Sequence, residues 1–368
     1  MEGLKVIVSG GGTGGHIFPA IAIANEIKAL NPQADILFVG ARGRMEMQRV
    51  PDAGYKIIGL PIEGFNRKNP FKNIKVLIDI LKSQWIARKV IKDFKPQVVV
   101  GVGGFASGPT LNTAAKMGIP TLIQEQNSYA GVTNKLLAKS ANRICVAYDG
   151  MDRFFPAEKI IMTGNPVRQT LLNSKISKEE ALKQFGLKPE CPTILIIGGS
   201  LGARTLNESV LGKLDTIQSS NIQIIWQTGK YYSQHIAETL AKHPKVDNLV
   251  VKDFISDMPS AYAAADLVVS RAGASSISEL CLLGKPCILV PSPNVAEDHQ
   301  TKNAKALSNI GAAILITDAE SPQKLIDSAI SVVQDGSKLK ELSANIKKLA
   351  ISDSANRIAK EVLKLAKA

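Results

Sequence analysis

The chain has little of several features that would by themselves indicate a function. Aromatic residues make up only 5% of its 368 residues, and it contains four cysteines and four histidines. Its apolar runs fall short of the ~18–20 residues that a transmembrane helix needs, and the N-terminal run is too short for a signal peptide. We therefore expect a protein that is soluble or attached to a membrane only at its surface.

Metal-binding patterns are also missing. The cysteines form neither a CxxC pair nor a Cys/His spacing; they are Cys145, Cys191, Cys281 and Cys287. We expect a reduced cytosolic protein whose thiols pack as small apolar side chains. No Asp-x-Asp pair follows a predicted strand, so we expect no metal on a diphosphate and no other cofactor.

Negative charge is scarce relative to positive charge. The chain has 45 Lys and Arg against 32 Asp and Glu, a net charge of +13. This excess favours an anionic partner, such as nucleic acid, a phosphorylated metabolite or an anionic membrane. Because no nucleic-acid motif occurs and aromatic residues rarely interleave with the basic ones, we expect no nucleic acid partner.

Apolar strand patterns alternate with helical patterns along the whole chain. The predicted strands are residues 5–9, 35–40, 97–101, 121–124, 143–147, 160–163, 193–197, 222–227, 246–251, 267–270, 287–290 and 313–316. Such alternation predicts an α/β fold with parallel sheets covered on both faces, and about six strands per half predict two Rossmann-like domains.

The turn at residues 163–168 contains Gly164, Asn165 and Pro166, and we place the domain boundary there. The predicted domains are residues 1–163 and 164–352. The last stretch, residues 353–368, follows a possible N-cap at residues 352–354 and reads as an amphipathic helix with Ile358, Val362 and Leu365 on its apolar face.

A glycine-rich loop at residues 10–15 follows the first strand and opens a helix. Glycines there can present backbone N–H groups to an anion beside the positive end of the helix dipole, so phosphate is the expected ligand. Gly10, Gly12 and Gly15 match the dinucleotide pattern GxGxxG. An NAD site also needs an acid at the end of the second strand, where residues 38–42 have none, which argues against an NAD-dependent oxidoreductase.

Two more glycine-rich loops, at residues 100–109 and 197–204, follow later strands without the Gly-Lys-Ser/Thr of a Walker loop. They indicate phosphate binding in both halves, with tight turns alone as the alternative. Ser275 and Ser276 at a later helix start suit phosphate oxygens, and Glu279 suits a ribose diol. The alternative there is a capping box in which Ser276 caps the helix and Glu279 bonds back.

Polar side chains at residues 124–127 and 297–303 also follow strands, where parallel sheets bind ligands. Among the histidines, His235 and His243 lie in a polar helical stretch and are expected at the surface. His16 closes the first glycine loop and is the best candidate for a general base, with capping or packing as the alternative.

A basic amphipathic stretch spans residues 66–95. It has nine cationic and two acidic residues, a net charge of +7. Apolar residues recur between them at helical spacing: Phe71, Ile74, Leu77, Ile78, Leu81 and Trp85. We expect this apolar face to contribute to the core and the surplus charge to favour docking on an anionic membrane. The alternative is an ordinary surface helix.

Seven motifs occur in the order typical of one family: residues 11–16, 103–109, 125–127, 164–168, 198–203, 271–274 with Glu279, and 298–300 with Asn303. In these motifs the chain resembles the MurG family, the UDP-N-acetylglucosamine transferases that make lipid II for peptidoglycan. The resemblance implies a GT-B glycosyltransferase fold, with two Rossmann-like domains facing a central cleft. The last helix would pack back on the first domain.

The resemblance also implies an activity: inverting transfer of GlcNAc from UDP-GlcNAc to the muramyl 4-hydroxyl of lipid I, releasing UDP. It implies a peripheral enzyme on the cytoplasmic face of the plasma membrane. The first domain would face acceptor and membrane, and the second would bind UDP-GlcNAc.

By the same resemblance, His16 would be the catalytic residue. The residues expected to bind UDP-GlcNAc are Thr13, Gly14, Gly15, Asn127, Arg168, Ser200, Ile255, Ala274, Ser275, Ser276, Glu279 and Gln300. The acceptor side would be Gly104, Phe105 and Glu125, and the loop at residues 13–15 would also face the acceptor's diphosphate.

Three positions depart from the family pattern. Phe105 stands where many members have Tyr, Gln124 where many have His, and His299 where some have Gln. Phe105 has no hydroxyl that could act there. Gln124 removes a rival base, which makes His16 more important. Two rivals stay open: a UDP-GlcNAc epimerase of the same fold and a non-catalytic nucleotide-binding module.

Overall fold

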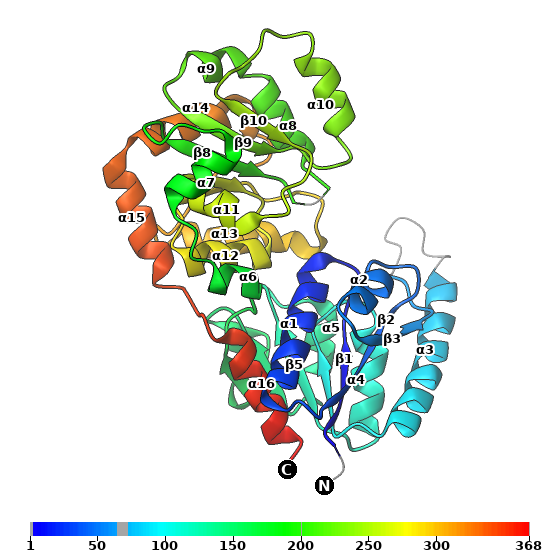
Figure 1. Ribbon diagram of the computed structural model, residues 1–368. Helices are drawn as coiled ribbons and strands as arrows, with labels where there is room; N and C mark the ends of the chain where they lie inside the picture. Colours follow the sequence, from blue (N-terminus) through cyan, green and yellow to red (C-terminus); the bar gives the residue numbers. More distant parts are fainter. Residues whose placement is uncertain (1–2, 65–72, 200, 368) are drawn as a thin grey trace. The chain divides into compact units, whose positions relative to one another are not determined.

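The structure is a computed structural model that describes residues 3–64, 73–199 and 201–367. It divides into two compact units (Figure 1). One contains Met1–Arg168 with Asp353–Ala368, and the other contains Gln169–Ser352. No helix among the described residues is long and apolar enough to cross a membrane.

The first unit contains a parallel sheet of seven strands in the order β3-β2-β1-β4-β5-β6-β7. Its strands are β1 (Lys5–Ser9), β2 (Asp35–Ala41), β3 (Lys56–Leu60), β4 (Val98–Gly101), β5 (Thr121–Glu125), β6 (Arg143–Val146) and β7 (Ile160–Met162). The α-helices are α1 (Gly14–Leu30), α2 (Glu46–Asp52), α3 (Asn73–Phe94), α4 (Ser107–Lys116), α5 (Val132–Leu137) and α16 (Ser354–Leu365). Short 3-10 turns lie at Met151–Arg153 and Ala157–Lys159.

The second unit contains a parallel sheet of six strands in the order β10-β9-β8-β11-β12-β13. Its strands are β8 (Thr193–Ile197), β9 (Gln223–Gln227), β10 (Leu249–Lys252), β11 (Leu267–Ser270), β12 (Cys287–Leu289) and β13 (Ile314–Leu315). The α-helices are α6 (Gln169–Asn173), α7 (Lys178–Phe185), α8 (Arg204–Leu211), α9 (Leu214–Ser219), α10 (Ser233–Leu240), α11 (Met258–Ala264), α12 (Ala274–Leu283), α13 (His299–Ser308), α14 (Ser321–Gln334) and α15 (Gly336–Lys347), with a 3-10 turn at Ala296–Asp298.

Both sheets are covered on their two faces, which explains why their strands are apolar throughout. On β1, Val6 and Val8 pack into a core with residues of α1 and α16. Ile7, which points to the opposite face, packs with residues of α3, α4 and α5. The prediction of two Rossmann-like parallel sheets is confirmed.

All twelve predicted strands have a counterpart, and one strand was missed. The edge strand β3 contains Gly59 and is followed by Pro61, which weakened the strand pattern in the sequence. The first sheet therefore has seven strands rather than about six.

The division between the units follows Arg168 rather than Thr163. Side chains of the first sheet hold the intervening turn: Gln124 Nε2 donates to Asn165 Oδ1 at 2.9 Å, and Asn165 Nδ2 donates to the Gln126 carbonyl at 2.9 Å. These buried amide contacts keep the 164–168 turn with the first unit.

The last helix, α16, packs beside α1 in the first unit (Figure 1). Ile358 and Val362 are fully buried, and Leu365 packs against the same core. Asp353 is the N-cap residue, but within the described chain its side chain accepts no capping hydrogen bond and instead pairs with Arg357 at 2.8 Å.

The thiols are free, as the cysteine spacing predicted. Cys145, Cys281 and Cys287 are buried and Cys191 is half-buried. Burial raises the pKa of Cys145 and of Cys281 to about 12, so both thiols stay protonated at neutral pH.

Candidate functional site

The strand order brings the first two glycine loops together. β1 and β4 are neighbours, so the loops that follow them meet at the point where the strand order reverses. Gly103 and Gly104 have φ of +90° and +85°, conformations that favour glycine. A Cβ on Gly104 would overlap the carbonyl oxygen of Gly11. The two loops are thus packed backbone to backbone.

Below the first loop lies Glu46, a fully buried residue in the first turn of α2. Its Oε2 accepts from the Gly12 N–H at 2.8 Å, and its Oε1 accepts from the Ala41 N–H at 3.0 Å. The carboxylate therefore uses an amide that a bound phosphate would otherwise use. The acid beside this loop thus lies in the first turn of the helix that follows β2, beyond the strand end at residues 38–42.

His16 is half-buried at the start of α1, and backbone contacts orient its ring. Nδ1 lies 3.1 Å from the Gly11 carbonyl oxygen and 3.3 Å from Thr13 Oγ1. Because a carbonyl oxygen can only accept, Nδ1 carries the proton in the neutral ring and Nε2 carries the lone pair. A Cβ on Gly103 would lie 2.9 Å from Nε2, so the second loop must be glycine there to admit the imidazole.

The polar stretch at residues 124–127, which begins with the last two residues of β5, is largely buried and internally bonded. Glu125 Oε1 accepts from the Asn127 N–H at 3.1 Å, and Oε2 accepts from Asn134 Nδ2 at 2.8 Å and the Gly131 N–H at 3.0 Å. Gln124 is fully buried and accepts from Gln126 Nε2. These contacts give Glu125 a role in shaping the loop that carries Asn127.

Phe105 lies beyond Gly104 and is 45% exposed. Its ring packs against Gly64, where an added Cβ would overlap it. Ser107 anchors the same turn from below, since its hydroxyl donates to the carbonyls of Ser9 at 2.8 Å and Gly103 at 2.9 Å. The turn at residues 103–107 is therefore anchored by Ser107 and exposes the ring of Phe105.

In the second unit, Gln227 connects two expected donor-binding segments. Its Nε2 donates to the Gly199 carbonyl at 2.9 Å, and its Oε1 accepts from the Ile255 N–H at 3.2 Å. Gly202 is also required, because a Cβ there would overlap the Thr228 carbonyl. Ser200, the expected diphosphate ligand in this loop, lies outside the described residues.

The start of α12 decides between the two interpretations of its serines. The N-cap residue is Gly273, and the first helical residue is Ala274. Ser276 lies inside the first turn, so the capping box is wrong. Ser275 Oγ is buried with no hydrogen-bond partner among the described residues. The N-cap glycine and the two serines of the first turn thus lie at the positive end of the helix dipole, where backbone N–H groups and a hydroxyl suit a diphosphate.

Glu279 lies one turn further along α12 and is buried. Its Oε2 accepts from the hydroxyl of Tyr262 at 2.9 Å, and Tyr262 is itself buried on α11. This bond orients the carboxylate. Tyr262 was not among the predicted site residues, because nothing in the local sequence connects it to a position 17 residues later.

The segment before α13 has an unusual backbone. Glu297 and Asp298 both lie in the left-handed region, with φ of +56° and +52°, a conformation that non-glycine residues seldom adopt. Gln300 Oε1 accepts from the Ser292 N–H at 2.8 Å, which ties α13 to the loop after β12. His299, the third departure from the family pattern, is half-buried at the start of the helix.

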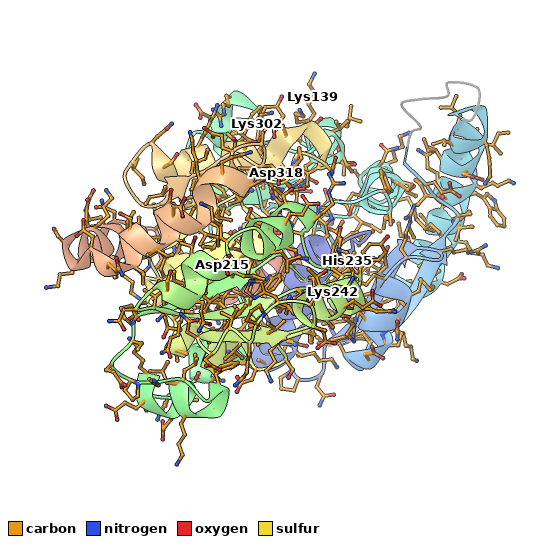
Figure 2. The ribbon with its side chains drawn as sticks, turned by 90° about the horizontal axis from the view of Figure 1, so that it is seen from above. Lys139, Asp215, His235, Lys242, Lys302 and Asp318 are labelled. Atoms are coloured by element: carbon orange, nitrogen blue, oxygen red, sulfur yellow. The ribbon has the colours of Figure 1, made fainter. Side chains whose placement is uncertain are left out.

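Arg271 anchors the same loop. It pairs with Asp318, labelled in Figure 2, at 2.5 Å, and it donates to the carbonyls of Val290 and Pro291, both at 3.2 Å. These bonds hold the backbone just before Ser292, the residue whose N–H donates to Gln300.

The structure also locates Arg168 and tests the expected exposure of two histidines. Arg168 is exposed at the end of the first unit. His235, labelled in Figure 2, is exposed, and His243 is half-buried beside Asp215 at 3.2 Å. Over the described ranges, no cluster of three or more His, Cys, Asp and Glu side chains could hold a metal ion.

Helix α3 corrects one prediction. Four of the six apolar residues expected to join the core are exposed instead, and the side chain of Ile74 is not described; the four are Leu77, Ile78, Leu81 and Trp85. A different face of the helix is buried, formed by Val76, Ser83, Ala87, Val90 and Ile91. Phe71 and the basic residues 67, 68 and 72 lie outside the described residues.

Two doubly wound parallel sheets with glycine loops at their strand ends define a nucleotide-binding class of α/β protein. Within that class, the glycosyltransferase family 28 N-terminal domain matches residues 6–146, and the family 28 C-terminal domain matches residues 193–358. The chain belongs to glycosyltransferase family 28 and is a glycosyltransferase with a GT-B-like fold.

A relative of similar length gives a more specific comparison than the family models. The chain is 66% identical over 366 residues to a Bacteroides thetaiotaomicron protein named UDP-N-acetylglucosamine–N-acetylmuramyl-(pentapeptide) pyrophosphoryl-undecaprenol N-acetylglucosamine transferase. The match covers 99% of this chain and 98% of the relative.

Solved structures agree on the fold. Acinetobacter baumannii MurG matches with a TM-score of 0.78 and 29% identity, covering 98% of this chain and 99% of that one. A UDP-GlcNAc 2-epimerase from Neisseria meningitidis matches with a TM-score of 0.67 and 17% identity. The match covers 98% of this chain and 100% of the epimerase chain. The second likeness supports the fold alone.

Proposed function

We propose that this enzyme transfers GlcNAc from UDP-GlcNAc to the muramyl 4-hydroxyl of lipid I, with inversion at the anomeric carbon, to give lipid II and UDP. The observation that carries this proposal is the 66% identity over 99% of the chain to a transferase named for that donor and acceptor. The epimerase alternative has only a 17% identical structural neighbour.

The second unit carries the groups for the donor nucleotide. The N-terminal turn of α12, with Ala274, Ser275 and Ser276, would receive the diphosphate, which suits the glycine N-cap and the buried Ser275 hydroxyl. Glu279, oriented by Tyr262, would accept hydrogen bonds from the ribose. The Ile255 N–H already donates to Gln227, so its carbonyl would be the group that meets uracil. Gln300 would bind the sugar.

The first unit carries the proposed base. In the reaction, the acceptor oxygen bonds to the anomeric carbon while the bond from that carbon to the UDP oxygen breaks, and UDP leaves with the electron pair. The acceptor proton passes to His16 Nε2, the atom that carries the lone pair when Nδ1 donates to Gly11. Thr13, Gly14, Gly15, Asn127 and Arg168 would contact the donor, and Gly104 and Phe105 the acceptor.

The largest change in charge during the reaction is on the leaving group. The departing diphosphate gains negative charge, which the N-terminal amides of α12 and the cation of Arg168 would stabilise. Backbone amides and a guanidinium would thus be the groups that stabilise the leaving group.

The exposed face of α3 supports docking on an anionic membrane. Leu81 and Trp85 are 67% and 69% exposed, and they lie on one side of the helix with Leu77 and Ile78. Exposed cations surround them: Lys75, Lys82, Arg88, Lys89 and Lys92. An apolar stripe bordered by cations suits the interface of a bilayer with anionic lipids. We place the enzyme peripherally on the cytoplasmic face of the plasma membrane.

The activity test uses UDP-GlcNAc and lipid I, with detection of UDP and of the disaccharide lipid. The wild type should form both, and His16→Ala should lower kcat by about 10²–10⁴-fold, the usual contribution of a general base. His235→Ala, an exposed histidine labelled in Figure 2, is the matched control and should keep wild-type turnover.

Two contrary results of this test would change different parts of the proposal. Formation of a free epimer without acceptor would replace the transferase proposal with the epimerase. Near-normal turnover by His16→Ala would remove only the base assignment.

A further inference from the structure

A buried acid without a direct part in the proposed chemistry lies beneath the first glycine loop. Glu46 is fully buried, and its two carboxylate oxygens accept from two backbone N–H groups, one of Gly12 and one of Ala41. Gly12 is 34 positions away in sequence. The carboxylate thus connects the end of β2 to the loop after β1.

Nearby glycines make room for the Glu46 side chain. A Cβ on Gly11 would overlap the Glu46 carboxylate, and a Cβ on Gly40 would lie 2.6 Å from Glu46 Cγ. Gly11 has φ of +153°, and its carbonyl oxygen accepts from His16 Nδ1 at 3.1 Å. The same short segment therefore contacts Glu46 on one side and the imidazole on the other.

We propose that Glu46 is a positioning residue for the transfer reaction. By holding the Gly12 amide, it fixes the Gly11 carbonyl, and that carbonyl keeps His16 in the tautomer with its proton on Nδ1. The proposal rests on His16 being the base of the proposed function. It also gives the GxGxxG loop a new role, since Gly12 binds an internal carboxylate and the loop orients a histidine.

Glu46→Gln tests this in the full chain. The amide keeps the size of the side chain, but its NH₂ group cannot accept from a backbone N–H. The kcat should fall by about 10–100-fold, the usual effect of misplacing a reacting group by about 1 Å. The KM for UDP-GlcNAc should rise by less than kcat falls, because the groups proposed for the uracil, the ribose and the diphosphate lie mainly in the second unit.

A double-mutant cycle separates positioning from general damage. In a His16→Ala background, Glu46→Gln should cause little further loss, because the residue through which it acts is gone. An equal loss in both backgrounds, or an unchanged kcat in the single variant, would overturn the proposal.

Asp266→Asn is the matched control. Asp266 Oδ2 accepts from the Thr193 N–H at 2.9 Å, so this variant also removes a carboxylate that holds a backbone amide, but in the second unit. It should lower Tm without changing kcat. If Glu46→Gln does not fold, Gly11→Ala disturbs the same contact from the loop side and should give the same kinetic pattern.

A measurement independent of turnover distinguishes this inference from the proposed function. With only four histidines in the chain, the ¹⁵N signals of the His16 ring can be assigned by their absence in His16→Ala. At a pH where the ring is neutral, the wild type should show the Nδ1–H tautomer, and Glu46→Gln should show a mixture of tautomers. An unchanged tautomer in the variant would overturn the inference, whereas a wild type that makes no lipid II would overturn the proposed function.

Discussion

Glu46 and Glu279 are both buried carboxylates, but their neighbours differ. Both oxygens of Glu46 accept from backbone N–H groups, so it shapes a loop. Glu279 accepts from a side-chain hydroxyl, that of Tyr262, at 2.9 Å at the end of a helical turn. We propose a ligand-binding role only for Glu279, because both oxygens of Glu46 already accept from backbone N–H groups.

The bond to Tyr262 gives a prediction for donor binding. Tyr262→Phe removes the hydroxyl that orients Glu279, and a hydrogen bond to a charged group contributes about 1.5 kcal/mol or more. UDP should therefore bind roughly tenfold more weakly, as measured by calorimetry. Tyr55→Phe also removes a tyrosine hydroxyl bond, to the neutral amide oxygen of Asn25 at 2.7 Å in the first unit, and should bind UDP normally. Equal affinities for wild type and Tyr262→Phe would contradict the ribose assignment.

At the scale of elements, the first residue of α12 and the buried face of α3 each decide a question that the sequence left open. α12 begins at Ala274 with Gly273 as N-cap, so Ser276 cannot close a capping box with Glu279. On α3, two faces are apolar, and the fold buries only one. The periodic pattern in the sequence did not indicate which of the two faces packs on the sheet.

The exposed face of α3 predicts membrane affinity. Leu81→Ser with Trp85→Ser should weaken binding to vesicles of anionic lipid by roughly tenfold or more, because each large apolar side chain gains about 1.5–3 kcal/mol on full burial. Binding is measured by vesicle sedimentation.

The matched control for α3 changes two exposed apolar residues of the second unit, Ile310→Ser with Leu349→Ser, which should leave binding unchanged. The core face of α3 is untouched in the test variant, so its Tm should stay near that of the wild type. Vesicle binding that is equal in both double variants would exclude this face as the docking surface.

At the scale of the whole molecule, the chain ends in the unit where it began. Asn356 Nδ2 donates to Glu26 Oε1 at 2.6 Å, a contact 330 positions apart in sequence. Ile358, Ala359 and Val362 join the core beside α1 and β1. The first unit therefore includes the last helix, although the second unit separates them in sequence.

This arrangement predicts where a core change will act. Ile358→Ala should destabilise the first unit by about 2–5 kcal/mol, the range for removing a large buried aliphatic side chain. In hydrogen exchange, peptides from α1 should then exchange faster, while peptides from β8 and α12 should keep their protection. Leu349→Ala, at a partly exposed position, should change neither set. Uniform loss of protection in both units would contradict this independence.

The sequence by itself determined the alternation of strands and helices, the parallel sheets, the glycines at strand ends and the family. These features depend on local chemistry: apolar strands need two covered faces, and sharp turns after strands need glycine. The strand β3 was missed because Gly59 interrupts its pattern beside Pro61.

Only the tertiary structure decided which polar groups meet. Glu46 contacts Gly12 across 34 positions, Tyr262 contacts Glu279 across 17, and the exposed face of α3 is the one that the sheet does not cover. Such contacts depend on strand order and helix rotation, which no local pattern specifies. The tautomer of His16 likewise depends on a carbonyl whose direction is set by a buried acid on another element.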